Sequence, residues 1–215
     1  MNQEHVFLCG NPALDFVATL RARRSARFEM FASPDRLDAW YLASGLVDTV
    51  APADASHVER ATAVREAVYG LVAARLAAGP LGAEALAVVN AAAGEPVPAL
   101  RLTPAGRRRA DATQEEALSL VARHAVEVLG GPEVPLLKEC GNATCTRVYI
   151  DRSRGMRRQW CGMESCGNRL KAAAYRARKK QSAQAAQEAD PGAVPGAGSG
   201  VAPGGREAVR GASVG

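Results

Sequence analysis

The sequence predicts a mainly α protein with a smaller β component (α+β): a helical N-terminal domain with a β-hairpin, followed by a small cysteine-rich module. Composition gives the first reason, because 47% of the residues are apolar but only 5% are aromatic, which favours closely packed helices over an aromatic-rich β-sandwich. Apolar residues also recur at three- and four-residue steps along the longest segments, as on one face of a helix. Four of the five cysteines lie within residues 140–166, which sets that module apart.

Five helices are expected in the helical domain, which we place at residues 5–131. The second begins at Ser33, a residue type that caps helix N-termini, with Pro34 at the first helical position. In the last, Thr113 and Glu116 are spaced as a capping box. The expected helices span residues 12–20, 33–44, 56–79, 82–94 and 113–131, and a strand through Phe16 is the alternative for the first.

A β-hairpin is expected before the last of these helices, at residues 99–113. Leu100 and Leu102 alternate with Arg101, and a Pro-Ala-Gly sequence at 104–106 supplies the turn. Residues 21–27 are expected to be only a basic connection.

The cysteines form two pairs with the same spacing: Cys140 and Cys145, then Cys161 and Cys166. Thiolates are soft donors, and four of them close a tetrahedral site around Zn²⁺. Two disulfides would need an oxidising compartment, and an iron–sulfur cluster usually has shorter spacings. One structural zinc ion is therefore the favoured cofactor, and Cys9, which has no partner of similar spacing, is expected to be a buried apolar residue.

The cysteine module is predicted to be a treble-clef-like zinc finger (knuckle, β-hairpin, helix) at residues 136–184. Between the cysteine pairs, Val148–Ile150 is expected to pair with Met156–Trp160 across a turn at Asp151–Gly155. A helix rich in alanine and basic residues follows the last cysteine. Pro132 and Pro135 mark the boundary before the module.

Residues 188–215 are rich in Ala, Gly and Pro and contain almost nothing to bury, so we expect a disordered tail. No apolar run approaches the roughly 20 residues that cross a bilayer, and the N-terminus has no signal-peptide pattern. We therefore expect a cytoplasmic protein that has no membrane partner.

Positive charge is confined to one part of the chain. Residues 138–180 hold twelve Lys and Arg against three acids, whereas residues 1–137 hold thirteen against sixteen. A basic excess of this kind indicates a nucleic-acid partner, although a solvated basic helix is the alternative. The residues expected to contact phosphates are Arg154, Arg157, Arg158, Arg169, Lys171, Tyr175, Arg176, Arg178, Lys179 and Lys180.

No catalytic pattern stands out, so we expect no enzyme activity. The three histidines are scattered, and a closed four-cysteine site leaves zinc no open coordination position. Asp15 is the one unusual polar residue, inside an apolar run; helix capping or a buried hydrogen bond is the favoured role, and contact with a ligand is the alternative.

The motif C-x4-C followed by W-C-x-M-x-x-C-G-N-R-x-K resembles the CGNR zinc-finger family, with Cys166-Gly167-Asn168-Arg169 as the naming sequence. Asp151, Ser153 and Arg154 also match that family's hairpin, but Gln159 is inserted before the tryptophan. The family's finger commonly follows an ABATE domain that starts with L-D-F-V-N-T, and residues 14–19 here read LDFVAT, with alanine in place of asparagine. The resemblance implies a stress-response transcription regulator.

Three functions remain open at this point. A DNA-binding transcription regulator leads, with a helical domain that senses a small-molecule effector or forms a homodimer. An RNA-binding protein is the second, and a thiol-redox or protein-interaction module the third. Asn168 and Trp160, next to zinc ligands, are expected to brace the metal site more than to read bases.

Overall fold

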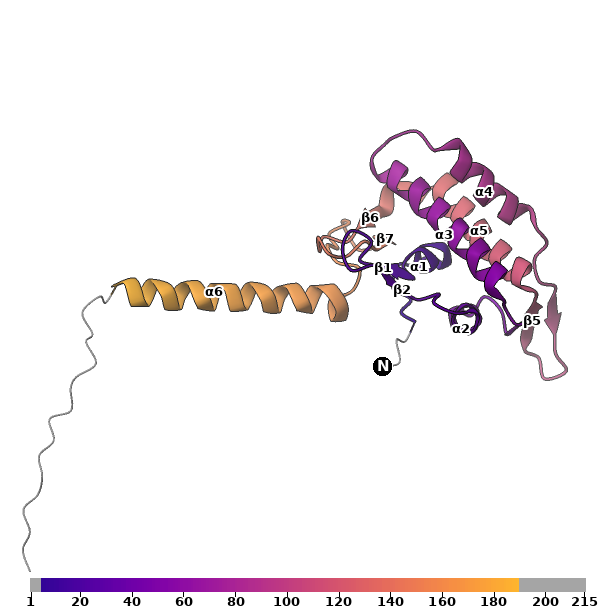
Figure 1. Cartoon of the computed structure of the whole chain (residues 1–215), viewed down its shortest axis with the longest axis horizontal. Helices are drawn as coiled ribbons and strands as arrows, with labels where there is room; N and C mark the ends of the chain where they lie inside the picture. Colours follow the sequence, from indigo (N-terminus) through magenta and orange to yellow (C-terminus); the bar gives the residue numbers. More distant parts are fainter. Residues whose placement is uncertain (1–4, 190–215) are drawn as a thin grey trace, which may run out of the picture. The chain divides into compact units, whose positions relative to one another are not determined.

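The computed structural model describes residues 5–189 (Figure 1). The described residues fall into two units, divided after Ala173, and each is described here by itself. The expected disordered tail at 188–215 lies almost wholly outside the described residues.

The five expected helices are present in the first unit. They are α1 (Pro12–Val17), α2 (Pro34–Ser44), α3 (Ala55–Leu76), α4 (Ala83–Gly94) and α5 (Gln114–Gly130). Helices α3, α4 and α5 lie side by side, and α1 packs against α3 and α5 (Figure 1). The mainly α fold class is confirmed, with small sheets beside the helices.

Helix starts follow the predicted chemistry with one exception. At α5 the Thr113 Oγ1 accepts from the backbone N–H of Glu116 at 3.2 Å, and the Glu116 carboxylate accepts from the N–H of Thr113 at 2.8 Å, which is the predicted capping box. Ser33 holds the N-cap position of α2, but its side chain makes no capping hydrogen bond.

Two sheets lie in the helical domain. The predicted hairpin is β4 (Leu100–Leu102) with β5 (Arg108–Ala112), and β5 also pairs in parallel with β3 (Thr49–Val50), which the sequence analysis missed. The expected basic connection is a second hairpin, because β1 (Leu20–Arg21) pairs with β2 (Phe28–Glu29).

The core of the helical domain consists mostly of Ala, Val and Leu, with a cluster of aromatic side chains at α1 and α2. Phe16 lies 4.9 Å from Trp40 and 5.3 Å from Phe31, measured between ring centroids. Among the polar residues, Arg65 is only 2% exposed and forms a bidentate pair with Glu29 at 2.6 and 2.7 Å. The interior of the helical domain is therefore mainly apolar, and the buried charge of Arg65 is paired with Glu29.

The finger has a different strand pairing from the predicted one. β7 (Val148–Ile150) pairs in antiparallel register with β6 (Leu137–Glu139), and Met156–Trp160 forms no strand. The first cysteine pair thus sits in the loop of the β6–β7 hairpin, as a knuckle, and the second pair follows at the π-helical turn η2 (Met163–Gly167). A 3₁₀ turn, η1 (Val134–Leu136), precedes β6.

Helical domain and finger are packed together in the first unit, despite the two prolines between them. Three successive carbonyls accept from the finger: Leu8 from Arg158 at 3.1 Å, Cys9 from Ile150 at 2.9 Å, and Gly10 from Arg152 at 3.0 Å. Gly10 has φ +82°, and a Cβ there would lie 3.2 Å from the Arg152 guanidinium.

The last helix, α6 (Asn168–Ala189), begins in the first unit and continues in the second. Every side chain from Lys171 to Ala185 is exposed.

Candidate metal centre and nucleic-acid interface

The four predicted cysteines converge at one place. Their Sγ atoms all lie within 4.8 Å of one another. The Sγ of Cys161 is 3.8 Å from that of Cys145 and 3.7 Å from that of Cys166. A tetrahedral zinc site with Zn–S bonds of about 2.3 Å has sulfur–sulfur edges of about 3.8 Å, so the cluster fits one structural zinc ion.

Backbone turns bring the sulfurs together. The N–H of Cys140 donates to the carbonyl of Arg147 at 2.9 Å, and the N–H of Cys145 donates to that of Asn142 at 2.7 Å, which closes the first knuckle. In the second, the N–H groups of Cys166 and Gly167 both donate to the carbonyl of Gly162, at 3.1 and 3.0 Å. The ligand set is closed, which leaves zinc no position for a substrate.

Trp160 packs closely beside both knuckles. A Cβ added to Gly141 would lie 3.0 Å from its indole ring, and one added to Gly167 would lie 3.2 Å from it. Each of these glycines directly follows a cysteine ligand. The indole of Trp160 thus lies beside the residue after a ligand in each knuckle, and its bracing role stays a prediction.

Asn142, and not Asn168, supplies the amide that contacts a sulfur. The Nδ2 of Asn142 donates to the Sγ of Cys166 at 3.5 Å, and its Oδ1 accepts from the N–H of Thr144 at 3.2 Å. Asn168 is exposed and its side chain forms no hydrogen bond with any described residue. The signal for Asn142 was its place inside the first cysteine pair, where an amide two residues after a ligand can turn toward the sulfurs.

The neighbouring thiols shift one another's pKa values in opposite directions. The hydrogen bond from the Cys145 thiol, followed by the contact with Arg147, lowers the pKa of Cys161 to about 4. The same bond raises the pKa of Cys145, because its proton is the one that is donated. The guanidinium of Arg147 lies 4.0 Å from the Cys161 Sγ and is almost fully buried.

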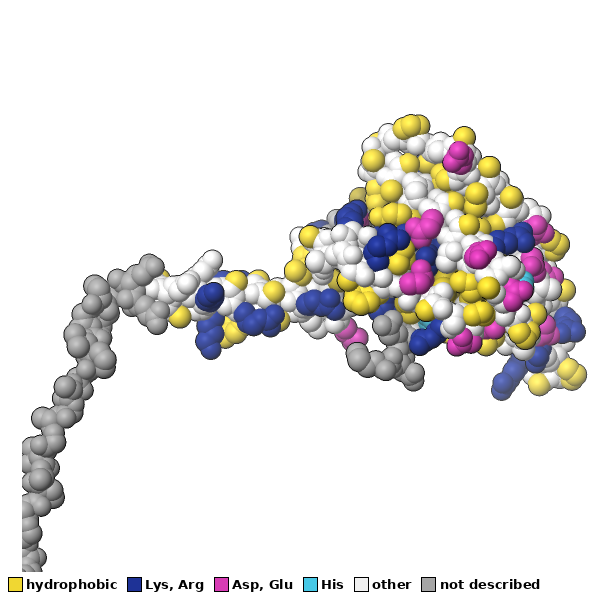
Figure 2. Space-filling model, in the orientation of Figure 1, with side chains coloured by type: hydrophobic (Ala, Val, Ile, Leu, Met, Phe, Trp, Pro, Cys, Tyr) yellow, Lys and Arg dark blue, Asp and Glu magenta, His cyan; other side chains and the backbone are white. Residues whose placement is uncertain are grey.

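The residues predicted to contact phosphate are of two kinds: most have exposed side chains, and one is hydrogen-bonded within the fold. Nine of the ten have exposed side chains: Arg154, Arg157, Arg169, Lys171, Tyr175, Arg176, Arg178, Lys179 and Lys180. The last six of these belong to the exposed stretch of α6, whose visible charged side chains are all basic (Figure 2).

Arg158 is the exception: it is half-buried, and its side chain is bonded within the fold. Its guanidinium donates to the carbonyls of Trp160 at 2.8 Å, Leu8 at 3.1 Å and Cys161, and stacks 4.3 Å from the ring of Tyr149. A side chain with these bonds holds the fold and has little left to offer a phosphate.

Asp151 organises the loop that carries Arg154 and Arg157. Its carboxylate accepts from the Ser153 hydroxyl at 2.6 Å, the Lys138 ammonium at 2.7 Å and the N–H of Arg158 at 3.1 Å. Burial opposes the charge of Asp151, but the hydrogen bonds from Lys138 and Ser153 prevail and hold its pKa well below the usual range.

Asp15 has the structural role that the sequence favoured. Its Oδ1 accepts from the N–H groups of Leu8 and Cys9, each at 2.9 Å, and the residue is 7% exposed. Burial raises the pKa of Asp15, and the hydrogen bonds from Cys9 oppose that rise. The alternative role of Asp15, contact with a ligand, finds no support in this arrangement. Cys9 is fully buried, as expected.

Comparisons with known proteins agree with this arrangement. The ABATE family model, described as "Putative stress-induced transcription regulator", matches residues 10–132, and the CGNR zinc finger model matches residues 137–179. No curated protein matches the chain. No helix in the described part of the chain is long and apolar enough to cross a membrane. The chain belongs to the ABATE family, and a CGNR zinc finger follows its helical domain.

Proposed function

We propose that the protein is a transcription regulator that binds DNA through its finger and the basic helix α6. One observation carries the proposal: the run from Ser165 to Gln187 contains six Lys and Arg and no acid, and it begins beside the last zinc ligand. These six cations have exposed side chains, so they are free to replace the counterions of a phosphate backbone.

Charge separation within the chain supports the same proposal. The helical domain is slightly acidic, so only the finger and α6 would be drawn to a polyanion. Exposed Tyr175 lies among these cations and could stack on a sugar or a base. Contacts to phosphate give affinity without sequence preference, so DNA specificity rests on contacts that α6 or the loop at 152–157 makes with bases.

The test measures DNA binding against salt concentration with matched variants. Arg176→Gln/Arg178→Gln removes two cations from α6, and Arg107→Gln/Arg108→Gln removes two equally exposed ones from the helical domain. For the α6 variant we expect the slope of log Kd against log salt to fall by about 2, while the control keeps the wild-type slope.

DNA fragments selected from the host genome should also bind better than random duplex at physiological salt. Equal binding of selected and random duplex would contradict the proposal that the protein is a sequence-specific transcription regulator. Stronger competition by RNA than by DNA would favour the RNA-binding alternative. Negligible affinity for both, with zinc release by mild oxidants, would point to the redox alternative.

A further inference from the structure

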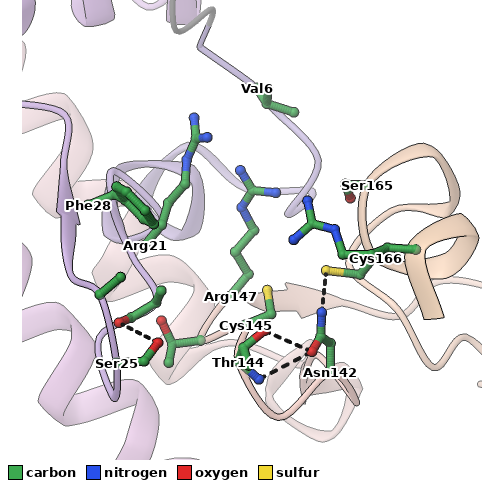
Figure 3. A pocket seen from close by; sticks show the side chains of 14 residues that line it. Val6, Arg21, Ser25, Phe28, Asn142, Thr144, Cys145, Arg147, Ser165 and Cys166 are labelled. Carbon is green, nitrogen blue, oxygen red and sulfur yellow. Dashed lines mark hydrogen bonds between the residues drawn. The ribbon is translucent and has the colours of Figure 1, made fainter. Parts of the chain in front are cut away.

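A cavity of about 380 Å³ lies between the β1–β2 hairpin of the helical domain and the two cysteine knuckles of the finger. Arg21, Ala22 and Phe28 line it from the hairpin, and Asn142, Cys145 and Arg147 line it from the first knuckle. Figure 3 shows the side chains of Arg21 and Arg147 extending in the same direction, one from each region. All of the lining residues belong to the first compact unit.

The residues that line this cavity include cations but no acid. Arg21, Arg147 and Arg169 line it, and no Asp or Glu does. A zinc ion with four thiolates has a net charge of about −2. Arg147 faces the Cys161 sulfur and balances part of that charge. Asp15, which does not line the cavity, also interacts with the charge of Arg147, so the unpaired donors of Arg21, and not the total charge, point to an anion.

The guanidinium of Arg21 has hydrogen-bond donors without an oxygen acceptor among the described residues. Its Nε is buried and has no hydrogen-bond partner among the described residues, and its Nη2 reaches only the sulfur of Met30, at 3.1 Å. Burial, and next the charge of Arg147, lower the pKa of Arg21. The charges of Arg21 and Arg147, which line the same cavity, repel each other, and an anion between them would relieve that repulsion.

The remaining walls limit the size and kind of anion. Val6, Phe28, Ala22 and Ala26 give apolar surface, and the hydroxyls of Thr144 and Ser165 lie nearby. We propose that the cavity binds a small organic anion, with its carboxylate or phosphate between Arg21 and Arg147 and its apolar part against Phe28. Such a ligand would contact the helical domain, the knuckle and Arg169 in the first turn of α6 together.

The inference does not depend on nucleic-acid binding, because the anion can be tested on the protein alone. The probes are benzoate, inorganic phosphate and, as the neutral counterpart of benzoate, benzyl alcohol, added to zinc-loaded full-length protein at constant ionic strength. Calorimetric titration should show saturable binding of at least one of the two anions and none of benzyl alcohol. Arg21→Gln should weaken the anion about tenfold or more, since a charge-assisted hydrogen bond is lost.

Two further variants separate binding from folding. Arg21→Lys keeps the charge and should retain part of the affinity, whereas Arg107→Gln, on the distant β4–β5 hairpin, should keep all of it. Zinc content and circular dichroism establish that each variant is folded. The proposal is overturned if neither anion binds saturably to wild type, or if Arg21→Gln binds as tightly as wild type; the arginines would then serve only to balance the thiolates.

Discussion

The helical domain buries mainly apolar side chains around Trp40, whereas the finger adds to a few apolar residues of β6 and β7 a set of buried thiols and hydrogen-bonded polar groups around Cys161. In the first region, α3, α4 and α5 share a continuous apolar core, so each side chain contributes a small part of the stability. In the second, Asn142, Arg147 and Asp151 are buried beside the cysteines, and their desolvation must be offset by hydrogen bonds and by the metal.

The difference shows how a short segment keeps a defined shape. The finger has two three-residue strands, β6 and β7, and too little apolar surface to fold by burial alone. Metal binding concentrates the stability of the finger in four metal–sulfur bonds. The finger is also supported by the helical domain, because finger residues donate hydrogen bonds to the carbonyls of residues 8–10. Three changes would test this contrast, from the largest expected effect to the smallest.

Removal of the metal should unfold one region and spare the other. Structural zinc contributes about 10–16 kcal/mol in isolated fingers, so chelation or Cys161→Ser should abolish the finger's order. Hydrogen exchange should become fast for amides of β6, β7 and η2, while amides of α3 and α5 remain protected. Metal analysis should show the loss of one zinc ion per chain. Equal loss of protection in α3 and α5 would mean that the two regions fold as one.

The reverse change affects the apolar core. Leu71 in α3 is 1% exposed, and Leu71→Ala should lower the free energy of unfolding of the helical domain by about 2–5 kcal/mol. Denaturant titration by circular dichroism measures the loss. Zinc content should stay at one ion per chain, because no cysteine ligand depends on this contact. A variant that loses zinc at neutral pH without denaturant would contradict the contrast.

The smallest effect concerns the ion pair between buried Arg65 and partly exposed Glu29. Burial opposes the charge of Glu29, but the hydrogen bonds from Arg65 prevail and keep its pKa below the ordinary value. A lowered pKa stabilises the fold above the unfolded-state pKa, and this stability is lost as pH falls through the folded-state pKa. Because Glu29 is partly exposed, Glu29→Gln should cost only about 1 kcal/mol at pH 7.

The cost of Glu29→Gln should also shrink as pH falls below the unfolded-state pKa of about 4.3 toward the lower folded-state pKa of Glu29. Urea titrations of wild type and variant at pH 7 and pH 4 measure both effects. A cost that is equal at the two pH values would exclude the ion pair as its source.

Local chemistry in the sequence was enough to predict the helices and the metal ligands. The capping box at Thr113 and Glu116 marked a helix start, and paired cysteines marked the zinc site, because both signals lie within a few residues. The partner of β7 was mispredicted because Leu137–Glu139 and Met156–Trp160 are both close in sequence, and packing decides between them. Arg158 looked like its exposed neighbours, since only the folded chain shows which carbonyls its guanidinium reaches.

The segment Leu8–Gly10 limits how far the finger can be treated as a transferable module. The carboxylate of Asp15 accepts hydrogen bonds from the N–H groups of Leu8 and Cys9. The carbonyls of residues 8, 9 and 10 accept hydrogen bonds from three finger residues: Arg158, Ile150 and Arg152. A fragment cut at residue 136 would lose these acceptors, although it would keep every zinc ligand. The smallest graftable unit therefore joins two distant stretches of chain, and a fusion protein that carries the finger needs the α1 region with it.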